Sequence, residues 1–263
     1  MIRHLRHNHL WRFLQNRSYN EEKESIFAKK INMRNVFSET MKMSDLVLNN
    51  TKLLLMLPRF DIKLGFGDRS VSEVCEESNV SPHFFLLICS VYCNNGYVPS
   101  REDLTKVDHN TLINFLLESH KYYLCERLPH IEEHLNHIIE ECIPKYGLTL
   151  RQFFNDYKKE VEEHFKYEEE KVFPYIQQIV AQTVKSQFSI KEFHKNHTNI
   201  EDKLSDLMNI LIKYLPADVF PKERIDITLD IIDLSSDLSS HKMIEERVLI
   251  PFVESIENSI NEF

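Results

Sequence analysis

The sequence contains only four glycines among its 263 residues, and each lies in a short segment between longer apolar stretches. A sheet protein needs glycine at many of its turns, so this scarcity argues against a β-rich fold. The chain also has no run of about 18 apolar residues, which argues against a helix that crosses a membrane. A largely helical protein is the class that remains.

Positive charge is in short supply as well. Lysine and arginine number 32 against 41 aspartates and glutamates, which gives a formal net charge of −9. Nucleic acids and anionic membranes usually bind basic surfaces, so the charge balance disfavours both as partners. The five cysteines form no C-x-x-C pair and have apolar neighbours, as in "LLICSVYC", which indicates reduced thiols. The opening "MIRHLRHNHLWRFLQNR" lacks the apolar core of a secretory signal, so we expect a cytoplasmic protein.

The first hundred residues divide into two parts by composition. Residues 1–40 are polar and lack sustained periodicity, which predicts a disordered leader, and Met33 within it is a candidate translation start. Residues 41–104 predict a small helical domain with a glycine loop at "RFDIKLGFGDRS". One of its helices is expected to have Ser81 as N-cap and Pro82 as its first residue.

The part from residue 108 to residue 260 carries the most sustained helical pattern. Apolar residues recur three and four positions apart in "TLINFLLESH", "LSDLMNILIKYL" and "IDITLDIIDL", so each helix has a stripe to bury. The breaks between the periodic segments are short enough to join antiparallel neighbours. We therefore predict an all-α fold, an antiparallel up-down four-helix bundle preceded by the small helical domain. The four helices are expected at 109–143, 149–182, 187–215 and 222–258.

Two stretches of the bundle repeat one pattern. Both "HFKYEEEKVFP", from His164, and "HKMIEERVLIP", from His241, have glutamate four and five residues after the histidine and end in proline. Residues four apart share one face of a helix, so Glu168 can join His164, and Glu245 can join His241, at one point between helices. An imidazole beside a carboxylate suits iron, manganese or zinc.

Two further histidines complete a symmetric set. His120 precedes His164 by 44 residues, and His197 precedes His241 by 44 residues, so the bundle consists of two matched helical hairpins. Hairpins of equal span place these side chains at one level, where four imidazoles and two carboxylates suit a pair of metal ions. The two glutamates can each bridge both ions, and the remaining charge leaves an open position for a small ligand. The predicted metal ligands are His120, His164, Glu168, His197, His241 and Glu245.

Other side chains near these positions are predicted to have supporting roles. Glu169 and Glu246 point away from the preceding glutamates and either face solvent or orient a ligand. Pro174 and Pro251 remove a helical hydrogen bond and are expected to kink the two ligand-bearing helices at matching heights. His130, His134 and His137 are expected to form a stripe that is solvated or supports the ligands, in preference to a second metal site. His194 either ligates the metal or lies at the rim of the site.

The repeated pattern resembles the H-x3-E-E/N-x2-φ-φ-P signature of hemerythrin-like HHE domains, and the resemblance covers roughly residues 110–258. The preceding stretch, "MSDLVLNNTKLLLMLPRFDIKLGFGDRSVSEVCEESNVSP", is similar to the small N-terminal domain of the iron–sulfur cluster repair di-iron proteins. That family places two adjacent cysteines in the loop where this chain has Lys63 and Leu64. The thiol chemistry of such a pair is therefore absent here.

The resemblance implies a non-haem di-iron centre with two iron ions per chain and an oxo or hydroxo bridge, held by the six predicted ligands. It also implies repair of iron–sulfur clusters damaged by nitric oxide or oxidants, with nitric oxide or oxygen as ligand and damaged iron–sulfur proteins as partners. The alternative is a hemerythrin-like sensor or binding module for these gases without turnover, which the missing cysteine pair favours. The sequence leaves open whether the centre turns over a substrate.

Two further classes are disfavoured by particular residues. A DNA-binding regulator would need a basic recognition helix, whereas "PHFFLLICSVY" has no lysine or arginine. A ferritin-like oxidase uses glutamates and Glu-x-x-His motifs, and the predicted ligand set here is richer in histidine. The apolar character of "PHFFLLICSVY" leaves a homodimer open, because so short a domain covers such a helix only in part.

Overall fold

The computed structural model of the protein describes residues 37–141, 144–183, 188–196, 200 and 202–261. Residues 39–263 belong to one compact unit. The predicted leader, residues 1–40, lies outside the described residues except for its last four positions. Every regular element in the described ranges is a helix, and the one pairing of extended residues within them is an isolated bridge between Lys42 and Ser70. The all-α prediction is confirmed. None of the described helices is both long and apolar enough to cross a membrane.

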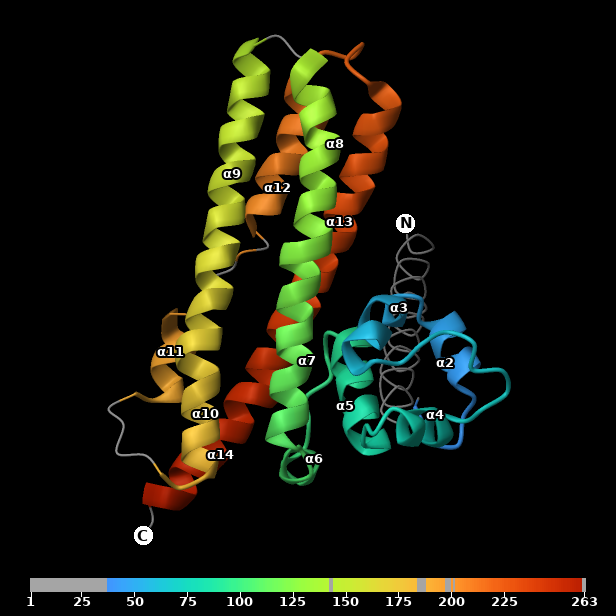
Figure 1. Cartoon of the computed structure of the whole chain (residues 1–263), viewed down its shortest axis with the longest axis vertical. Helices are drawn as coiled ribbons and strands as arrows, with labels where there is room; N and C mark the ends of the chain where they lie inside the picture. Colours follow the sequence, from blue (N-terminus) through green and yellow to red (C-terminus); the bar gives the residue numbers. More distant parts are fainter. Residues whose placement is uncertain (1–36, 142–143, 184–187, 197–199, 201, 262–263) are drawn as a thin grey trace, which may run out of the picture. The chain divides into compact units, whose positions relative to one another are not determined.

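Four columns of helix form the antiparallel bundle, and each column consists of successive segments (Figure 1). The first column comprises α7 (His109–Tyr122), η3 (Tyr123–Arg127) and α8 (Leu128–Glu141). The second comprises α9 (Pro144–Tyr167), η4 (Glu168–Val172) and α10 (Phe173–Val180). The third comprises α11 (Ile190–Asn196), α12 (Asp202–Asn209) and η5 (Ile210–Tyr214). The fourth comprises α13 (Pro221–Ile244), η6 (Glu245–Leu249) and α14 (Ile250–Asn261).

The columns close into a ring around one apolar core. The helix α8 packs against α9 and α13, and α12 packs against the same two helices (Figure 1). In the stretch "IDITLDIIDL", Ile227, Ile231 and Leu234 face inward, whereas the other apolar residues of the stretch are exposed. Burying each leucine or isoleucine stabilises the fold by about 1.5–3 kcal/mol. Members of this core from all four columns include Ile131, Leu135, Phe154, Leu204 and Ile231.

The third column is divided, whereas the sequence predicted one helix over 187–215. The helix α11 packs against α14, and α12 packs against α9 and α13. The carboxylate of Glu257 on α14 fixes the start of α11, because it accepts hydrogen bonds from the Ile190 N–H at 2.8 Å and the Tyr175 hydroxyl at 2.6 Å. The two pieces thus pack against different partners, and residues 197–199 between them lie outside the described ranges.

The segments η3, η4, η5 and η6 are π-helical turns, and each ends two residues before a proline. In an α-helix the proline ring clashes with the carbonyl four residues earlier, which here belongs to the middle residue of the turn. The wider turn moves that carbonyl aside. Such turns precede Pro174 and Pro251, where the sequence predicts kinks, and equivalent turns precede Pro129 and Pro216.

The first two columns meet more closely than the sequence indicated. The predicted break "PKYGL" is part of a helix, since α9 begins at Pro144, where a proline at the first position suits the helix start. A Cβ atom on Gly147 would lie 2.8 Å from the backbone oxygen of Ile139 on α8. Glycine therefore permits the close approach of α9 to the end of α8.

Residues 43–105 form what we call the N-terminal helical segment. Its elements are α2 (Met43–Asn49), α3 (Leu53–Met56), η2 (Leu57–Phe60), α4 (Val71–Glu77), α5 (Pro82–Cys93) and α6 (Arg101–Thr105). The predicted cap of α5 is present, because Ser81 Oγ accepts a hydrogen bond from the Phe84 N–H at 3.4 Å. Gly65 and Gly67 adopt positive φ angles of 104° and 59°, which explains the glycines of the loop before α4.

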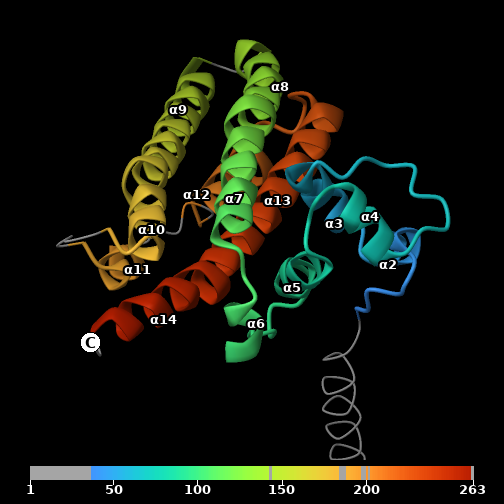
Figure 2. The ribbon, with the colours of Figure 1, turned by 60° about the horizontal axis from the view of Figure 1, so that its bottom comes forward.

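The apolar helix α5 packs against α13 within the same chain (Figure 2). Its buried side chains include Phe84, Phe85 and Ile88. The bundle thus covers part of this helix, and a homodimer stays a prediction. Whether residues 41–104 are a domain in their own right stays a prediction.

Candidate metal centre

Five of the six predicted ligands are described, and four of them form one buried cluster. His120 lies on α7, Glu168 is the first residue of η4, His241 lies on α13 and Glu245 is the first residue of η6. Their ligand atoms all lie within 4.8 Å of one another, and each residue is at most 2% exposed. The spacing read from the sequence thus brings together groups from three helical columns.

Of the two remaining predicted ligands, His164 is described in the structure and His197 is not. His164 on α9 lies next to the cluster, with its Nε2 atom 3.1 Å from Glu168 Oε1. His197 lies outside the described residues, directly after α11, which ends at Asn196. That these six residues ligate metal stays a prediction.

Each carboxylate of the cluster faces an imidazole. Glu168 Oε2 lies 3.1 Å from His120 Nε2, and Glu245 Oε1 lies 2.9 Å from His241 Nε2. Both glutamates begin π-helical turns, where the local widening changes the direction of the side chains that follow. The carboxylates of two helices therefore point at the same interior point.

A third carboxylate orients one of the imidazoles. Glu169 Oε1 lies 2.9 Å from His120 Nδ1, and the Glu169 side chain is 41% exposed, at the edge of the site. Burial by itself lowers the pKa of His120, but hydrogen bonds with Glu168 and Glu169 outweigh burial and raise it to about 9. In this structure Glu169 has the orienting contact that the sequence left as one of two alternatives.

Aromatic rings enclose the cluster. Phe165 stacks on His120 with ring centroids 4.0 Å apart and an angle of 9° between the planes. The ring of Phe173 lies 5.7 Å from His120, and the edge of Tyr123 meets His241 at 5.7 Å and 90°. This wall excludes water, so that charges inside it interact more strongly than they would in solvent.

The residues present fit a metal site. Glu168 and Glu245 are buried close together, and burying carboxylates is costly unless opposite charge compensates them. One imidazole nitrogen, His241 Nδ1, is buried and has no hydrogen-bond partner among the described residues. Imidazole and carboxylate together are ligands that iron, manganese and zinc accept.

A model of the hemerythrin HHE cation-binding domain matches residues 111–253. The chain belongs to the hemerythrin HHE family. The matched range covers more than half of the chain, and it contains all six predicted ligands and the four columns of the bundle apart from their outer ends. A metal-cation-binding helical domain is therefore the functional class of residues 111–253. A search of curated proteins finds no match to the chain.

Sequence reasoning missed two residues beside the centre. Asp237 lies on α13, four residues before His241, and its buried side chain forms an ion pair with Arg59 of η2. The spacing D-x3-H-x3-E, on one helix face, is a signal that could have found Asp237. Nothing in the sequence marks Arg59, because its partner lies 178 residues away.

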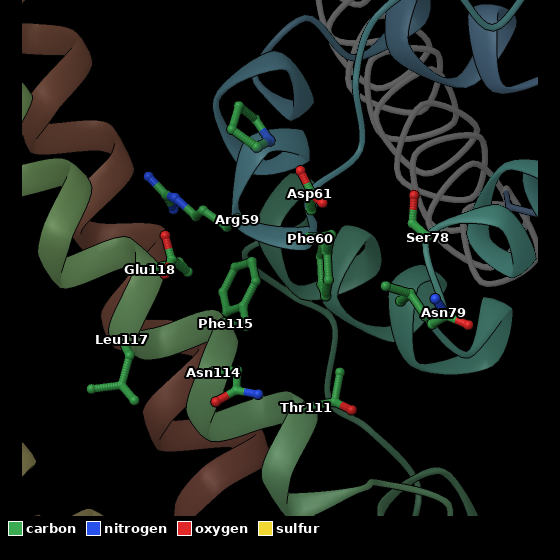
Figure 3. Close-up of a pocket in the computed structure, with 12 residues that line it drawn as sticks. Arg59, Phe60, Asp61, Ser78, Asn79, Thr111, Asn114, Phe115, Leu117 and Glu118 are labelled. Carbon is green, nitrogen blue, oxygen red and sulfur yellow. The ribbon is translucent and has the colours of Figure 1, made fainter.

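A groove on the described surface lies apart from the predicted metal ligands. It has a volume of about 630 Å³ and lies between η2, the turn before α5, and α7 (Figure 3). Thr111, Asn114 and Phe115 line one side, and Asp61 and Asn79 line another. None of the predicted ligands lines this groove.

Proposed function

We propose that the protein holds two iron ions between His120, His164, Glu168, His197, His241 and Glu245. The observation that carries the proposal is the buried cluster of His120, Glu168, His241 and Glu245, with His164 beside it. Two buried carboxylates and up to four neutral imidazoles compensate half of the charge of two divalent ions. The remaining charge favours a small anionic bridge and leaves a position for a diatomic ligand.

When bound, the iron pair supplies redox chemistry and a binding position for nitric oxide or oxygen. The residues of the chain provide the surroundings of that chemistry. Phe165 and Phe173 keep water from the ligands, and Glu169 holds the His120 ring through its Nδ1 atom. Because Glu169 is partly exposed, the His120 side of the site is the one nearest solvent among these groups.

Within this class we propose a cytoplasmic part in the nitrosative and oxidative stress response, in which the protein repairs damaged iron–sulfur clusters. The support is the similarity of residues 41–104 to the small domain of the iron–sulfur cluster repair proteins. Damaged iron–sulfur proteins would be the partners, while nucleic acid and membranes would not. The acidic balance of the chain supports this exclusion.

A sensor or binding module for oxygen or nitric oxide is the second candidate. Lys63 and Leu64 stand where the repair family has its cysteine pair, so the thiol chemistry of that pair is missing. The N-terminal helical segment packs directly on α13, the helix that carries His241. A change at the metal would therefore have a short path to this segment.

The first experiment measures metal content and Mössbauer spectra of full-length protein produced anaerobically with iron-57. We expect about two irons per chain, with spectra that show the two ions to be magnetically coupled. The variant His164→Ala/His241→Ala should lose them, whereas His130→Ala/His137→Ala, which changes two exposed histidines of the same bundle, should keep them. Zinc, a single iron, or iron retained in the first variant would refute the di-iron proposal.

A second measurement separates the two candidates. The reduced, iron-loaded protein is exposed to oxygen or nitric oxide, and the gas is then removed while absorbance is followed. A spectrum that returns to its starting form identifies a binding module. Recovery of a nitric-oxide-damaged [4Fe–4S] protein, with no recovery when His164→Ala/His241→Ala replaces the wild type, identifies repair.

A further inference from the structure

The N-terminal helical segment reaches the metal centre through one buried ion pair. Arg59 of η2 pairs with Asp237 of α13, and both side chains are 2% exposed. Figure 3 shows Arg59 extending from η2 toward the bundle. Its guanidinium lies 5.1 Å from the ring centroids of both Tyr122 and Tyr123, so it also makes cation–π contacts with both rings.

This ion pair lies one helical turn from a predicted metal ligand. Asp237 and His241 are four residues apart on α13, so they share one face of the helix. Helical side chains lean toward the N-terminus, which directs the His241 ring toward the turn that carries Asp237. Tyr123 contacts the same histidine, since its ring edge meets His241 at 5.7 Å, and thus links Arg59 to His241 by a second route.

The two histidines of the cluster differ in how their outer nitrogens are held. His120 has Nε2 toward Glu168 and Nδ1 on Glu169 at 2.9 Å. His241 has Nε2 toward Glu245, but its buried Nδ1 has no hydrogen-bond partner in the described ranges. A histidine that binds metal through one nitrogen usually donates the other N–H to a carboxylate or carbonyl.

Asp237 can supply the carboxylate that His241 lacks. Its Oδ2 atom accepts from Arg59, while its Oδ1 atom is buried without a hydrogen-bond partner among the described residues. Asp237 also lines a cavity of about 90 Å³, which leaves the carboxylate room to turn. An unsatisfied donor and an unsatisfied acceptor therefore lie one turn apart, and pairing them removes the cost of both.

We propose that Asp237 orients His241 as Glu169 orients His120, and that Arg59 holds Asp237 in position, so that the N-terminal helical segment and the metal centre are energetically coupled. Arg59 and Asp237 are then positioning residues that act through His241 without touching the metal. The inference rests on the metal site proposed above.

Coupling of this kind acts in both directions. If the contact between Arg59 and Asp237 makes metal bind more tightly, bound metal must strengthen this contact by the same factor. The N-terminal helical segment would therefore respond to the state of the metal. Metal binding is expected to protect the amides of α3 and η2 from exchange, because the Arg59–Asp237 pair is a buried link between η2 and α13.

The first test uses full-length wild-type protein and compares hydrogen exchange with and without iron(II) under anaerobic conditions. We expect slower exchange over residues 53–60 when iron is bound. This measurement needs no variant, so a folding defect cannot obscure it. If the protein binds iron and exchange over 53–60 does not change, the coupling is refuted while the metal site stands; if no iron binds, the metal site itself is refuted.

The second test measures iron(II) affinity by competition with a chelator. Asp237→Asn removes the charge at nearly constant size, and Arg59→Met/Asp237→Leu replaces the pair by apolar groups without stranding a buried charge. We expect both to lose about 10–100-fold in affinity, as other carboxylates that orient metal ligands do. The long-range ¹H–¹⁵N spectrum of the histidine rings should also change at His241 in the metal-free protein.

Lys52→Ala is the matched control. Lys52 Nζ binds Ser236 Oγ at 2.9 Å, so it joins the same two parts of the chain beside Asp237, but on the exposed surface. Its removal should change iron affinity by less than about twofold, because exposed polar contacts contribute little. Wild-type affinity in the folded Arg59→Met/Asp237→Leu protein, or an equal loss in Lys52→Ala, would overturn the proposal.

Discussion

At the scale of single residues, the centre depends on which carboxylate faces which nitrogen. Glu168 and Glu245 face the Nε2 atoms of His120 and His241, whereas Glu169 takes the outer nitrogen of His120. Adjacent glutamates on one helix therefore have different tasks, because consecutive side chains on a helix point about 100° apart. Orientation of the ring by Glu169 is separable from ligation and can be tested by itself.

We predict that Glu169→Ala weakens iron(II) binding about 10–100-fold while the protein stays folded, because the His120 ring loses the contact that fixes its orientation. Chelator competition on anaerobic protein measures the affinity. Glu170→Ala is the matched control, since Glu170 is the next residue, is exposed, and forms a 3.9 Å contact with Lys166 in the described part of the chain. Equal affinities in the two variants would show that the Glu169 contact has no bearing on the metal.

At the scale of helical elements, the π-helical turns that precede prolines begin at residues in or beside the site. The π-helical turns η3, η4 and η6 begin at Tyr123, Glu168 and Glu245, each six residues before a proline. The widening that accommodates the proline therefore falls where three side chains enter the site. In the third column a side-chain contact positions the helix instead, because Glu257 of α14 accepts a hydrogen bond from the first residue of α11.

We predict that Glu257→Gln destabilises the protein by about 1.5–3 kcal/mol, the usual worth of hydrogen bonds to a charged group. The variant keeps one acceptor oxygen, whereas Glu257 now serves the Ile190 N–H, the Tyr175 hydroxyl and Ser189 Oγ. Denaturant unfolding measures the loss, and hydrogen exchange at the Ile190 amide should quicken.

Glu254→Gln, one turn earlier on α14, serves as the control for Glu257→Gln. It should leave both the unfolding free energy and the Ile190 exchange rate near their wild-type values, within about 0.5 kcal/mol. A similar loss in both variants would mean that α14 tolerates no loss of charge, and that the anchoring of α11 is not the cause.

At the scale of the whole molecule, metal binding and folding are linked. The predicted ligands come from helices more than a hundred residues apart, so the site exists only when the columns have assembled. A ligand that binds the folded chain but not the unfolded chain stabilises the fold by mass action. Without metal the buried carboxylates repel one another, which increases the difference in stability between the metal-bound and the metal-free protein.

We predict that a free iron(II) concentration of about 100 times Kd stabilises the protein by roughly 2.7 kcal/mol. This corresponds to a rise in Tm of roughly 5–10 °C for a chain of this size. Anaerobic thermal unfolding at several iron concentrations measures the shift. The His164→Ala/His241→Ala variant should show none, and an equal shift in it would place the stabilising metal elsewhere.

The sequence determined the helical character and most of the site, because both depend on local spacing. Apolar residues three and four apart fix a helix face, and His241 with Glu245 share a face whatever the rest of the chain does. His120 and His164 are as far apart in the sequence as His197 and His241, and this equal spacing also indicated two matched hairpins. These inferences needed no knowledge of which helices touch.

Only the tertiary structure decided which faces meet. The pairing of Arg59 with Asp237 joins residues 178 apart, and the division of the third column follows from contacts of α11 with α14 rather than from its own sequence. Such contacts depend on how apolar stripes pack in three dimensions, which local periodicity does not contain. Each pair of histidine and glutamate four residues apart is thus set by helical spacing. The link between these pairs and the N-terminal helical segment exists only in the folded chain.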